Sequence, residues 1–309
     1  MKKALILGKN GQVAWELART CPQDWQAKAC GREQVNLQEY SSLSGLVSEF
    51  SPDLLINAAA YTAVDKAESE REEAYALNQL AVANIADIAA EQGIPLVHIS
   101  TDFVFDGTKS SPYTAADHTA PLSVYGASKL AGEREILERS LPNALILRTS
   151  WVYSAHGQNF VKSMLRLMSD PQRQHLSIVS DQVGTPTWAH TLAWAIWTAG
   201  EAMVATRNPG GTRVFNWTDA GVASWYDFAV AIQELALERG LLEKLLPVQP
   251  IPHTDYPTPA VRPPYSVLDK SGFEQEFGVQ PKHWRNQLGE MLDELAVAGQ
   301  EVTQSTNPK

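Results

Sequence analysis

The run Ala4-Leu5-Ile6-Leu7-Gly8-Lys9-Asn10-Gly11-Gln12-Val13-Ala14 joins a short apolar strand to a glycine turn and the start of a helix. Glycines such as Gly8 and Gly11 permit a tight turn and let a phosphate approach the backbone. The helix that opens at Gln12 offers free N–H groups and the positive end of its dipole. The spacing is G-x-x-G-x-x-A, with Ala14 small enough for helix–strand packing. The stretch predicts a dinucleotide-binding turn, with an ordinary strand–helix turn as the alternative.

Further apolar runs recur in the first half of the chain and alternate with longer amphipathic stretches. Continuous apolar runs indicate strands buried on both faces, and parallel strands need crossover helices. We therefore predict an α/β fold whose doubly wound, Rossmann-like parallel sheet occupies residues 1–150. The predicted strands are Ala4–Leu7, Leu54–Ala60, Leu96–Ile99 and Ala144–Leu147, and the predicted helices are Gln12–Thr20, Leu37–Phe50, Ala63–Gln92 and Val124–Arg139.

After Arg148 the pattern loosens, and Trp, Pro and Gly become frequent. We expect a smaller C-terminal α/β domain over residues 151–309 that mainly binds substrate, with segments around 175–220 returning to the first domain. Gln249–Pro264 is too rich in proline for a helix and is predicted to be a binding loop, a lid or a simple connection. Closing helices are expected at Glu274–Phe277 and Trp284–Leu295, and a frayed end over Glu301–Lys309.

The composition limits the classes of function. The 309 residues suggest about two domains, and 44% apolar with 19% charged residues exclude a disordered chain. A formal net charge of −10 argues against a nucleic-acid partner, because such a surface repels phosphate backbones. No apolar run is long enough for a membrane span, and the apolar start is too short for a secretory signal. The two cysteines, Cys21 and Cys30, are expected to be reduced in a cytoplasmic protein.

The choice of dinucleotide is read at the end of the second predicted strand. An acidic residue there would bind the ribose 2′-hydroxyl of NAD(H). The sequence has Ala29-Cys30-Gly31-Arg32-Glu33 instead. Gly31 leaves space, and the guanidinium of Arg32 can pair with a 2′-phosphate. This favours NADPH and leaves NADH open, because Glu33 would repel a phosphate and Arg32 also suits a solvated surface.

Tyr125 and Lys129 stand four residues apart at the start of a predicted helix and so share one face. A lysine held near a tyrosine, with the positive nicotinamide also nearby, would lower the pKa of the phenol from about 10 towards the working pH. Such a tyrosine can donate a proton to a carbonyl oxygen while hydride arrives at the carbon. The pair alone is weak evidence for a catalytic site, since chance gives about a third of one such pair in a chain of this composition.

Two other predicted strands end in residues suited to the same edge of the sheet. Ligands in open α/β sheets bind beyond the carboxyl ends of the strands. Thr101 would place a hydroxyl there that can hydrogen-bond a carbonyl, or would simply end its strand. Ala58, Ala59 and Ala60 allow a dinucleotide to lie against the backbone, or serve close helix–sheet packing.

Together these residues resemble the extended short-chain dehydrogenase/reductase superfamily, and more narrowly the dTDP-4-dehydrorhamnose reductase family. The likeness covers roughly residues 3–295. The runs Ala63–Glu68 and Ser100–Gly107 are far more specific than the glycine turn. The other matching stretches are Gly8–Gln12, Asn57–Thr62, Tyr125–Glu133, Arg148–Tyr153, Asn159–Phe160, Asp181–Thr187 and Arg262–Pro263.

The resemblance implies reduction of the C4 ketone of dTDP-4-dehydro-L-rhamnose to dTDP-L-rhamnose, with NADPH or NADH as hydride donor. It implies that Tyr125 donates the proton, that Lys129 tunes Tyr125 and holds the nicotinamide ribose, and that Thr101 polarises the ketone. The cofactor-binding positions are then Gly8, Asn10, Gly11, Gln12, Val13, Arg32, Asn36, Leu37, Ala58, Ala59, Ala60, Tyr61, Thr62, Tyr125 and Lys129.

The resemblance also implies positions that surround the dTDP-sugar, to which we add Arg262 as a local positive charge. Two of them have a structural alternative, because Trp151 also suits a core and Asp102 a turn. The substrate-binding positions are Val64, Asp65, Asp102, Phe103, Trp151 and Arg262.

The sequence departs from the family at three places. Gly31 replaces the acidic residue after the second strand, and Asn36 stands beside Leu37 where many relatives have Asp. Some relatives form a dimer bridged by Mg²⁺ on glutamates, and Glu16 fits that pattern. His190 stands near the position of a second glutamate, and imidazole suits Mg²⁺ poorly. We therefore predict no metal site, expect a packed or capped His190, and leave a homodimer open.

Two alternative functions stay open. One is a reductase of another nucleotide-linked 4-keto-6-deoxy sugar, since epimers differ by one hydroxyl contact. The other is a non-catalytic, cofactor-binding regulator, against which the intact Thr101, Tyr125 and Lys129 argue. A dehydratase is disfavoured, because Phe103 occupies the position where an acid would drive the loss of water.

Overall fold

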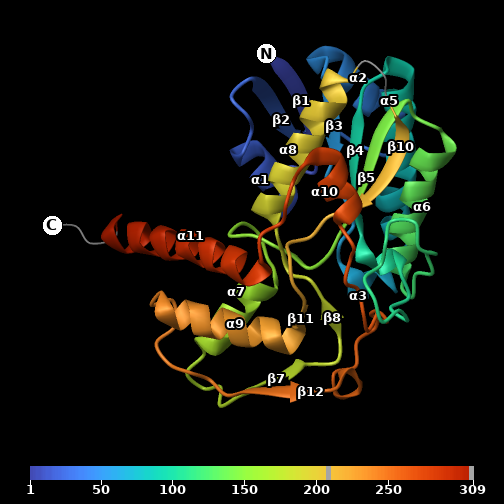
Figure 1. Ribbon diagram of the computed structural model, residues 1–309. Coiled ribbons are helices and arrows are strands. Elements are labelled where there is room, and N and C mark those ends of the chain that lie inside the picture. Colours follow the sequence, from blue (N-terminus) through green and yellow to red (C-terminus); the bar gives the residue numbers. More distant parts are fainter. Residues whose placement is uncertain (207–209, 306–309) are drawn as a thin grey trace.

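A six-stranded parallel sheet with helices on both faces forms the upper part of the molecule (Figure 1). The computed structural model describes residues 1–206 and 210–305, with side chains as far as residue 297. The strand order is β10-β5-β4-β3-β1-β2, and every neighbouring pair is parallel. The predicted doubly wound fold is confirmed. The strands are β1 (Lys2–Leu7), β2 (Trp25–Cys30), β3 (Leu54–Asn57), β4 (Leu96–Thr101), β5 (Asn143–Thr149) and β10 (Gly211–Asn216).

The strands are apolar on both sides because each face of the sheet is covered by helices. Leu5 and Leu7 pack with one apolar cluster, and Ala4 and Ile6 pack with another, as the two-residue period of a strand requires. The first cluster includes residues of α2 (Tyr40–Phe50), α5 (Ala81–Gln92) and α6 (Val124–Glu138). The second includes residues of α1 (Gln12–Arg19), α8 (Ala189–Ala205) and α10 (Ser271–Phe277).

The chain reverses direction across the sheet between β1 and β3. From β1 it moves outward to β2 and then returns to the other side of β1, where β3 begins the run towards β10. Open α/β sheets bind ligands at such a switch point, beyond the carboxyl ends of the strands. The glycine turn after β1 and the three alanines after β3 therefore meet at the expected place.

The predicted helix over 63–92 is broken into several pieces. They are α3 (Val64–Ala67), α4 (Arg71–Tyr75), a π-helical turn (Ala76–Leu80) and α5. The buried Asn78 in the π-turn bonds both backbone groups of Tyr61 and the hydroxyl of Ser128. These tertiary bonds hold the irregular turn, and periodicity alone does not reveal them. The third strand also ends earlier than predicted, at Asn57, and α2 begins at Tyr40 rather than Leu37.

The lower part of the molecule contains three two-stranded sheets and a third apolar cluster (Figure 1). α8 and β10 return from the second half of the chain to the main sheet. Residues 249–264 contain no α-helix, as predicted; they continue β12 into a 3₁₀ turn at His253–Asp255. The smaller elements are β6 (Val152–Tyr153), α7 (Phe160–Met168), β7 (Leu176–Val179), β8 (Val183–Gly184), β9 (Thr187–Trp188), β11 (Ala223–Ser224), α9 (Trp225–Glu238), β12 (Val248–Ile251) and α11 (Trp284–Ser305).

The C-terminal helix is longer than the sequence predicts. α11 continues to Ser305, into the stretch where fraying is expected, and residues 306–309 lie outside the described part of the chain. Among the described helices, none combines the length and the apolarity that crossing a membrane requires.

Candidate active site

The turn between β1 and α1 packs directly on the backbone that follows β3. Gly8 has φ +100°, and a Cβ there would lie 2.7 Å from the backbone nitrogen of Ala59. Only glycine fits this position. No side chain caps the N-terminus of α1, so its N–H groups remain available to an anion. The turn therefore fits the phosphates of a dinucleotide.

The remaining predicted cofactor residues lie around this turn in different settings. Arg32 is exposed just beyond β2, and the neighbouring Glu33 forms an exposed ion pair with Lys9 at 3.5 Å. Leu37 is buried in the core, and Asn36 accepts a hydrogen bond from the backbone of Gln38. Their contact with a cofactor stays a prediction. The other predicted positions are Asn10, Gly11, Gln12, Val13, Ala58, Ala60, Tyr61 and Thr62, which belong to the loops after β1 and β3 or to the start of α1.

Thr101 ends β4 and faces Tyr125 at the start of α6. Burial of the phenol raises the pKa of Tyr125 to about 12, although the Thr101 hydroxyl acts in the opposite direction. The ring of Tyr125 also meets the edge of Phe103, with 5.5 Å between ring centroids. A Cβ at Gly126 would lie 2.2 Å from the carbonyl oxygen of Phe103, so α6 can approach only because residue 126 is glycine. The packing holds Thr101 and Tyr125 together.

Burial decides the pKa of Tyr125 in this structure, and Lys129 is not among the groups that shift it. The ammonium group of Lys129 is buried and donates to the carbonyl oxygen of Ile99 at 2.7 Å. Burial lowers the pKa of Lys129 to about 8, although the charge of Glu133 acts in the opposite direction. The amino group of Lys129 is thus directed at this backbone carbonyl. Burial dominates at Tyr125, and its phenol keeps the proton.

A pocket opens beside Thr101 and Tyr125. Trp151 stacks on Trp225 with 3.5 Å between ring centroids and 6° between ring planes. Trp151 has φ +47°, a conformation that residues other than glycine rarely adopt. A Cβ at Gly184 would lie 2.7 Å from the Trp151 ring, so close packing holds the indole in place. The pocket is lined by Phe103, Trp151, Gln182, Trp225, Arg262, Pro263 and Ser266.

Arg262, which lines the pocket, forms an ion pair with Asp65. Two hydrogen bonds join the carboxylate and the guanidinium, at 3.0 and 2.8 Å. The hydrogen bonds from Arg262 hold the pKa of Asp65 below its usual value. The same guanidinium donates to the hydroxyl of Thr258 at 2.6 Å. The pair thus ties the proline-rich segment to α3, whose first residue is Val64.

Asp102 lies beneath the pocket rather than on its surface. It is 2% exposed, and the hydroxyl of Thr101 donates to its Oδ1 at 3.1 Å. Burial raises the pKa of Asp102 to about 6, although hydrogen bonds from the hydroxyls of Ser266 and Thr101 act in the opposite direction.

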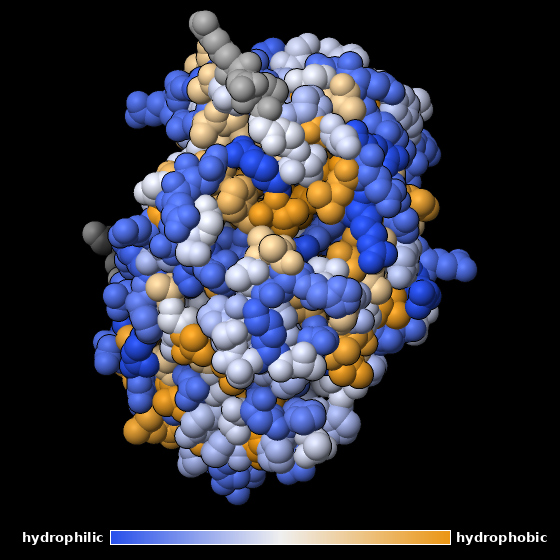
Figure 2. Space-filling model, turned by 45° about the vertical axis from the view of Figure 1, so that its right-hand side comes forward, coloured by the Kyte–Doolittle hydropathy of each residue, from blue (hydrophilic) through white to orange (hydrophobic). Residues whose placement is uncertain are grey.

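Apolar residues gather near the middle of the face seen in Figure 2 and are bordered by hydrophilic ones.

The comparisons with known proteins agree on one family. The family model described as "RmlD substrate binding domain" matches residues 1–297. A dTDP-4-dehydrorhamnose reductase of Sinorhizobium fredii is 39% identical, over 96% of this chain and 99% of its own length. The enzyme of the same name from Escherichia coli K12 is 40% identical, over 94% and 97%. The chain belongs to the dTDP-4-dehydrorhamnose reductase family.

Solved structures of this family share the fold. The Clostridium acetobutylicum reductase superposes with a TM-score of 0.85 at 34% identity, covering 95% of this chain and 99% of that one. The Bacillus anthracis reductase, solved in complex with NADP, gives a TM-score of 0.86 at 32% identity, covering 95% and 100%.

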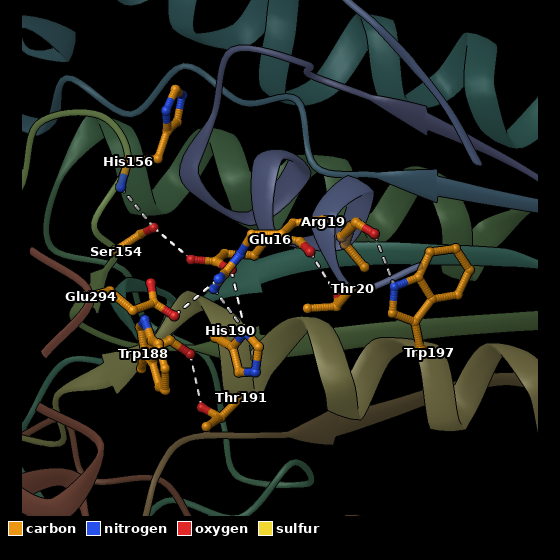
Figure 3. Close-up of polar contacts among 11 residues, drawn as sticks. Glu16, Arg19, Thr20, Ser154, His156, Trp188, His190, Thr191, Trp197 and Glu294 are labelled. Carbon is orange, nitrogen blue, oxygen red and sulfur yellow. Dashed lines mark hydrogen bonds and ion pairs between the residues drawn. The ribbon is translucent and has the colours of Figure 1, made fainter. Parts of the chain in front are cut away.

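In this member of the family the carboxylate of Glu16 is already paired with a guanidinium (Figure 3). Arg19 lies 2.6 Å from Glu16 and 2.9 Å from Glu294, and its Nη2 is 3.0 Å from His190 Nδ1. Ser154 donates to the other oxygen of Glu16 at 2.8 Å. Burial raises the pKa of Glu16, but its hydrogen bonds to these neighbours outweigh that effect and lower it. His190 also stacks on Trp188, with ring centroids 4.6 Å apart.

This donor set does not fit a divalent cation, because both oxygens of Glu16 are engaged and Arg19 brings its own positive charge. Among the described residues no group of His, Cys, Asp and Glu is arranged to hold a metal ion.

We expect that the protein has the same melting temperature in Mg²⁺ and in EDTA at equal ionic strength. Arg19→Gln is expected to melt earlier, because it leaves a buried carboxylate without its cation. A rise in melting temperature specific to Mg²⁺ in the unmodified protein would contradict this reading.

Four residues that line the pocket are not among the predicted site residues, namely Gln182, Trp225, Pro263 and Ser266. Trp225 is the first residue of α9 and directly follows the N-cap Ser224. The sequence around it shows a helix start, but nothing in it shows that Trp225 stacks on Trp151. No local spacing connects these segments to Thr101, so only the tertiary structure shows that they share a pocket.

Proposed function

We propose that this chain reduces the C4 ketone of dTDP-4-dehydro-L-rhamnose to dTDP-L-rhamnose with NADPH. The observation that carries the proposal is the position of Thr101 and Tyr125 beside the pocket, in a chain that belongs to the family over nearly its whole length. The relatives' names give the substrate, and the NADP complex of the Bacillus anthracis enzyme supports the cofactor.

Tyr125 is the proposed proton donor. Bound NADPH would supply the hydride to the sugar carbon. With a pKa of about 12, the phenol of Tyr125 is protonated at neutral pH and can donate to the ketone oxygen as negative charge develops there. The hydroxyl of Thr101 would stabilise the same oxygen with a second hydrogen bond. Lys129 would hold the cofactor's ribose from the next turn of α6.

The sugar nucleotide is proposed to lie in the pocket of the second half of the chain. The stacked Trp151 and Trp225 offer a flat apolar surface. Arg262 also lines the pocket, and it would have to exchange its partner Asp65 for the diphosphate to bind it. In this division, residues 1–150 hold the cofactor and residues 151–309 mainly recognise the substrate. A cytoplasmic location suits the two free cysteines, Cys21 and Cys30.

The direct test is NADPH oxidation with enzymatically prepared dTDP-4-dehydro-L-rhamnose, followed by absorbance. We expect oxidation that depends on the keto sugar and none with dTDP-glucose, which has no ketone to reduce. If NADPH is not consumed with the keto sugar, the proposal fails, and a regulatory role for a cofactor-binding protein becomes the better hypothesis.

The preference for NADPH is predicted to depend on Arg32. Arg32→Ala should lower the ratio of kcat/KM for NADPH to that for NADH about tenfold, because an exposed charge-assisted hydrogen bond to the 2′-phosphate is lost. Glu33→Gln should shift the ratio the other way, since it removes a negative charge beside the phosphate. Arg166→Ala, at another exposed arginine on α7, is the matched control. An unchanged ratio of kcat/KM for the two cofactors in Arg32→Ala would show that Arg32 does not distinguish NADPH from NADH.

A further inference from the structure

Two buried polar side chains connect the cofactor-binding loop to Lys129. Asn57 ends β3, and His98 is its direct neighbour in the register of β4. Asn57 Nδ2 lies 2.9 Å from His98 Nδ1, and His98 Nε2 lies 3.4 Å from Lys129 Nζ. All three side chains are at most 2% exposed. The proposed mechanism does not use Asn57 or His98.

The orientation of the Asn57 amide is determined by its other contact. The backbone N–H of Ala59 donates to Asn57 Oδ1 at 3.1 Å. A backbone N–H can only donate, so the amide oxygen must face Ala59 and the amide NH₂ must face His98. The reversed amide would set two donors against each other at Ala59. His98 Nδ1 is therefore a hydrogen-bond acceptor.

This contact also determines where His98 carries its proton. Burial lowers the pKa of His98 well below its ordinary value, with a further contribution from the nearby charge of Lys129, so the imidazole is neutral. A neutral imidazole has one N–H. Because Nδ1 accepts from Asn57, that proton is on Nε2, and it points towards the nitrogen of Lys129.

The Nε2–H of His98 disfavours a charged Lys129. An ammonium group has three donors and no acceptor, whereas a neutral amine has a lone pair that accepts from Nε2–H. Besides His98, the titratable group whose charge acts on Lys129 is Glu133, on its own helix. Glu133 favours the ammonium form although it is itself bound by Arg148 of β5 at 2.7 Å and by the hydroxyl of Ser100, and the burial of Lys129 outweighs it.

We propose that Asn57 and His98 are positioning residues: Asn57, oriented by the backbone of Ala59, holds His98 in the Nε2–H tautomer, which favours the neutral amine of Lys129 in the ligand-free enzyme. The role of Lys129 in this inference rests on the proposed function. The link begins at the cofactor-binding loop, because the Ala59 nitrogen is the atom that lies against Gly8. The backbone beside the glycine turn and the protonation state of Lys129 are thereby coupled through two side chains.

The tautomer is measured directly by ¹⁵N NMR of the ligand-free protein with labelled histidine. The His98 signals are assigned by their absence in His98→Gln. We expect a neutral ring with the proton on Nε2. A proton on Nδ1 in the unmodified protein overturns the inference. This readout needs no substrate, so it stands apart from the proposed function: a protein without reductase activity can still show the expected tautomer, and an active one can still refute it.

Asn57→Asp reverses the chain of hydrogen bonds with little change in shape. The new carboxylate still accepts from the backbone N–H of Ala59. Its second oxygen can only accept, so it favours a proton on His98 Nδ1. The proton between His98 Nε2 and Lys129 Nζ can then be carried by Lys129, which favours the ammonium form. We expect the NMR signal to show a protonated Nδ1. The pH midpoint of NADPH affinity, measured by fluorescence, should rise by at least one unit from a value near 8, given the lowered pKa of Lys129.

Asn143→Asp is the matched control, because it also adds a carboxylate at a buried asparagine of the sheet, where the side chain instead donates to the carbonyl of Met203. It should change neither the tautomer of His98 nor the midpoint. Equal midpoints in Asn57→Asp and the unmodified protein, or an Nδ1 that stays unprotonated in Asn57→Asp, would contradict the inference.

Discussion

Tyr125→Phe is expected to lower kcat for the reduction by about 10²–10⁴-fold, the usual contribution of a positioned general acid. The variant removes only the hydroxyl, so the edge contact between its ring and Phe103 is retained. The hydroxyl of Thr101 can still bind the ketone oxygen, but it cannot replace an acid whose proton moves to that oxygen. KM for NADPH should change little by comparison.

The control for this prediction is Tyr40→Phe. Tyr40 is exposed, and its hydroxyl donates to Glu91 on the surface. The control should keep its full kcat. A Tyr125→Phe enzyme with kcat within threefold of the unmodified protein would remove Tyr125 from the mechanism.

Gly132→Ala is expected to destabilise the protein by about 1–3 kcal/mol, the usual cost of overpacking. In an exposed helix the same change stabilises by about 0.5–1 kcal/mol, because alanine has the better helix propensity. Here a Cβ at residue 132 would lie 2.1 Å from the carbonyl oxygen of Asn78. Asn78 cannot move away easily, since its side chain bonds the backbone of Tyr61 and the hydroxyl of Ser128.

Gly45→Ala is the matched control, because Gly45 also lies inside a helix, α2, but has nothing within 4 Å of its Cβ position. Chemical denaturation should show the two variants moving in opposite directions, with Gly45→Ala slightly more stable than the unmodified protein. If Gly132→Ala is as stable as Gly45→Ala, the close approach of α6 to the π-turn is wrong.

The elements that could be predicted from the sequence are those that local patterns determine. The buried strands read as apolar runs, and the glycine turn carries its own steric requirement at Gly8. The π-turn at Asn78 could not be predicted, because bonds to Tyr61 and Ser128 hold it. Likewise, the pairing of Asn57 with His98 depends on the register of two parallel strands, which the runs themselves do not specify.

The candidate site shows the same division. The i, i+4 spacing of Tyr125 and Lys129 is local and could be read from the sequence. The direction of the pKa shift at Tyr125 depends on how deeply the phenol is buried, which the spacing does not show. Trp225 joins Trp151 only through the packing of α9.

The central claim is hydride transfer from NADPH to C4 of the sugar, and one measurement tests it most directly. The protein is incubated with NADPH deuterated at C4 of the nicotinamide, on the transferring face, and with dTDP-4-dehydro-L-rhamnose, and the product is examined by NMR. We expect dTDP-L-rhamnose with deuterium at C4 of the sugar. A product with no deuterium, with deuterium at another carbon, or with the opposite configuration at C4 would contradict it.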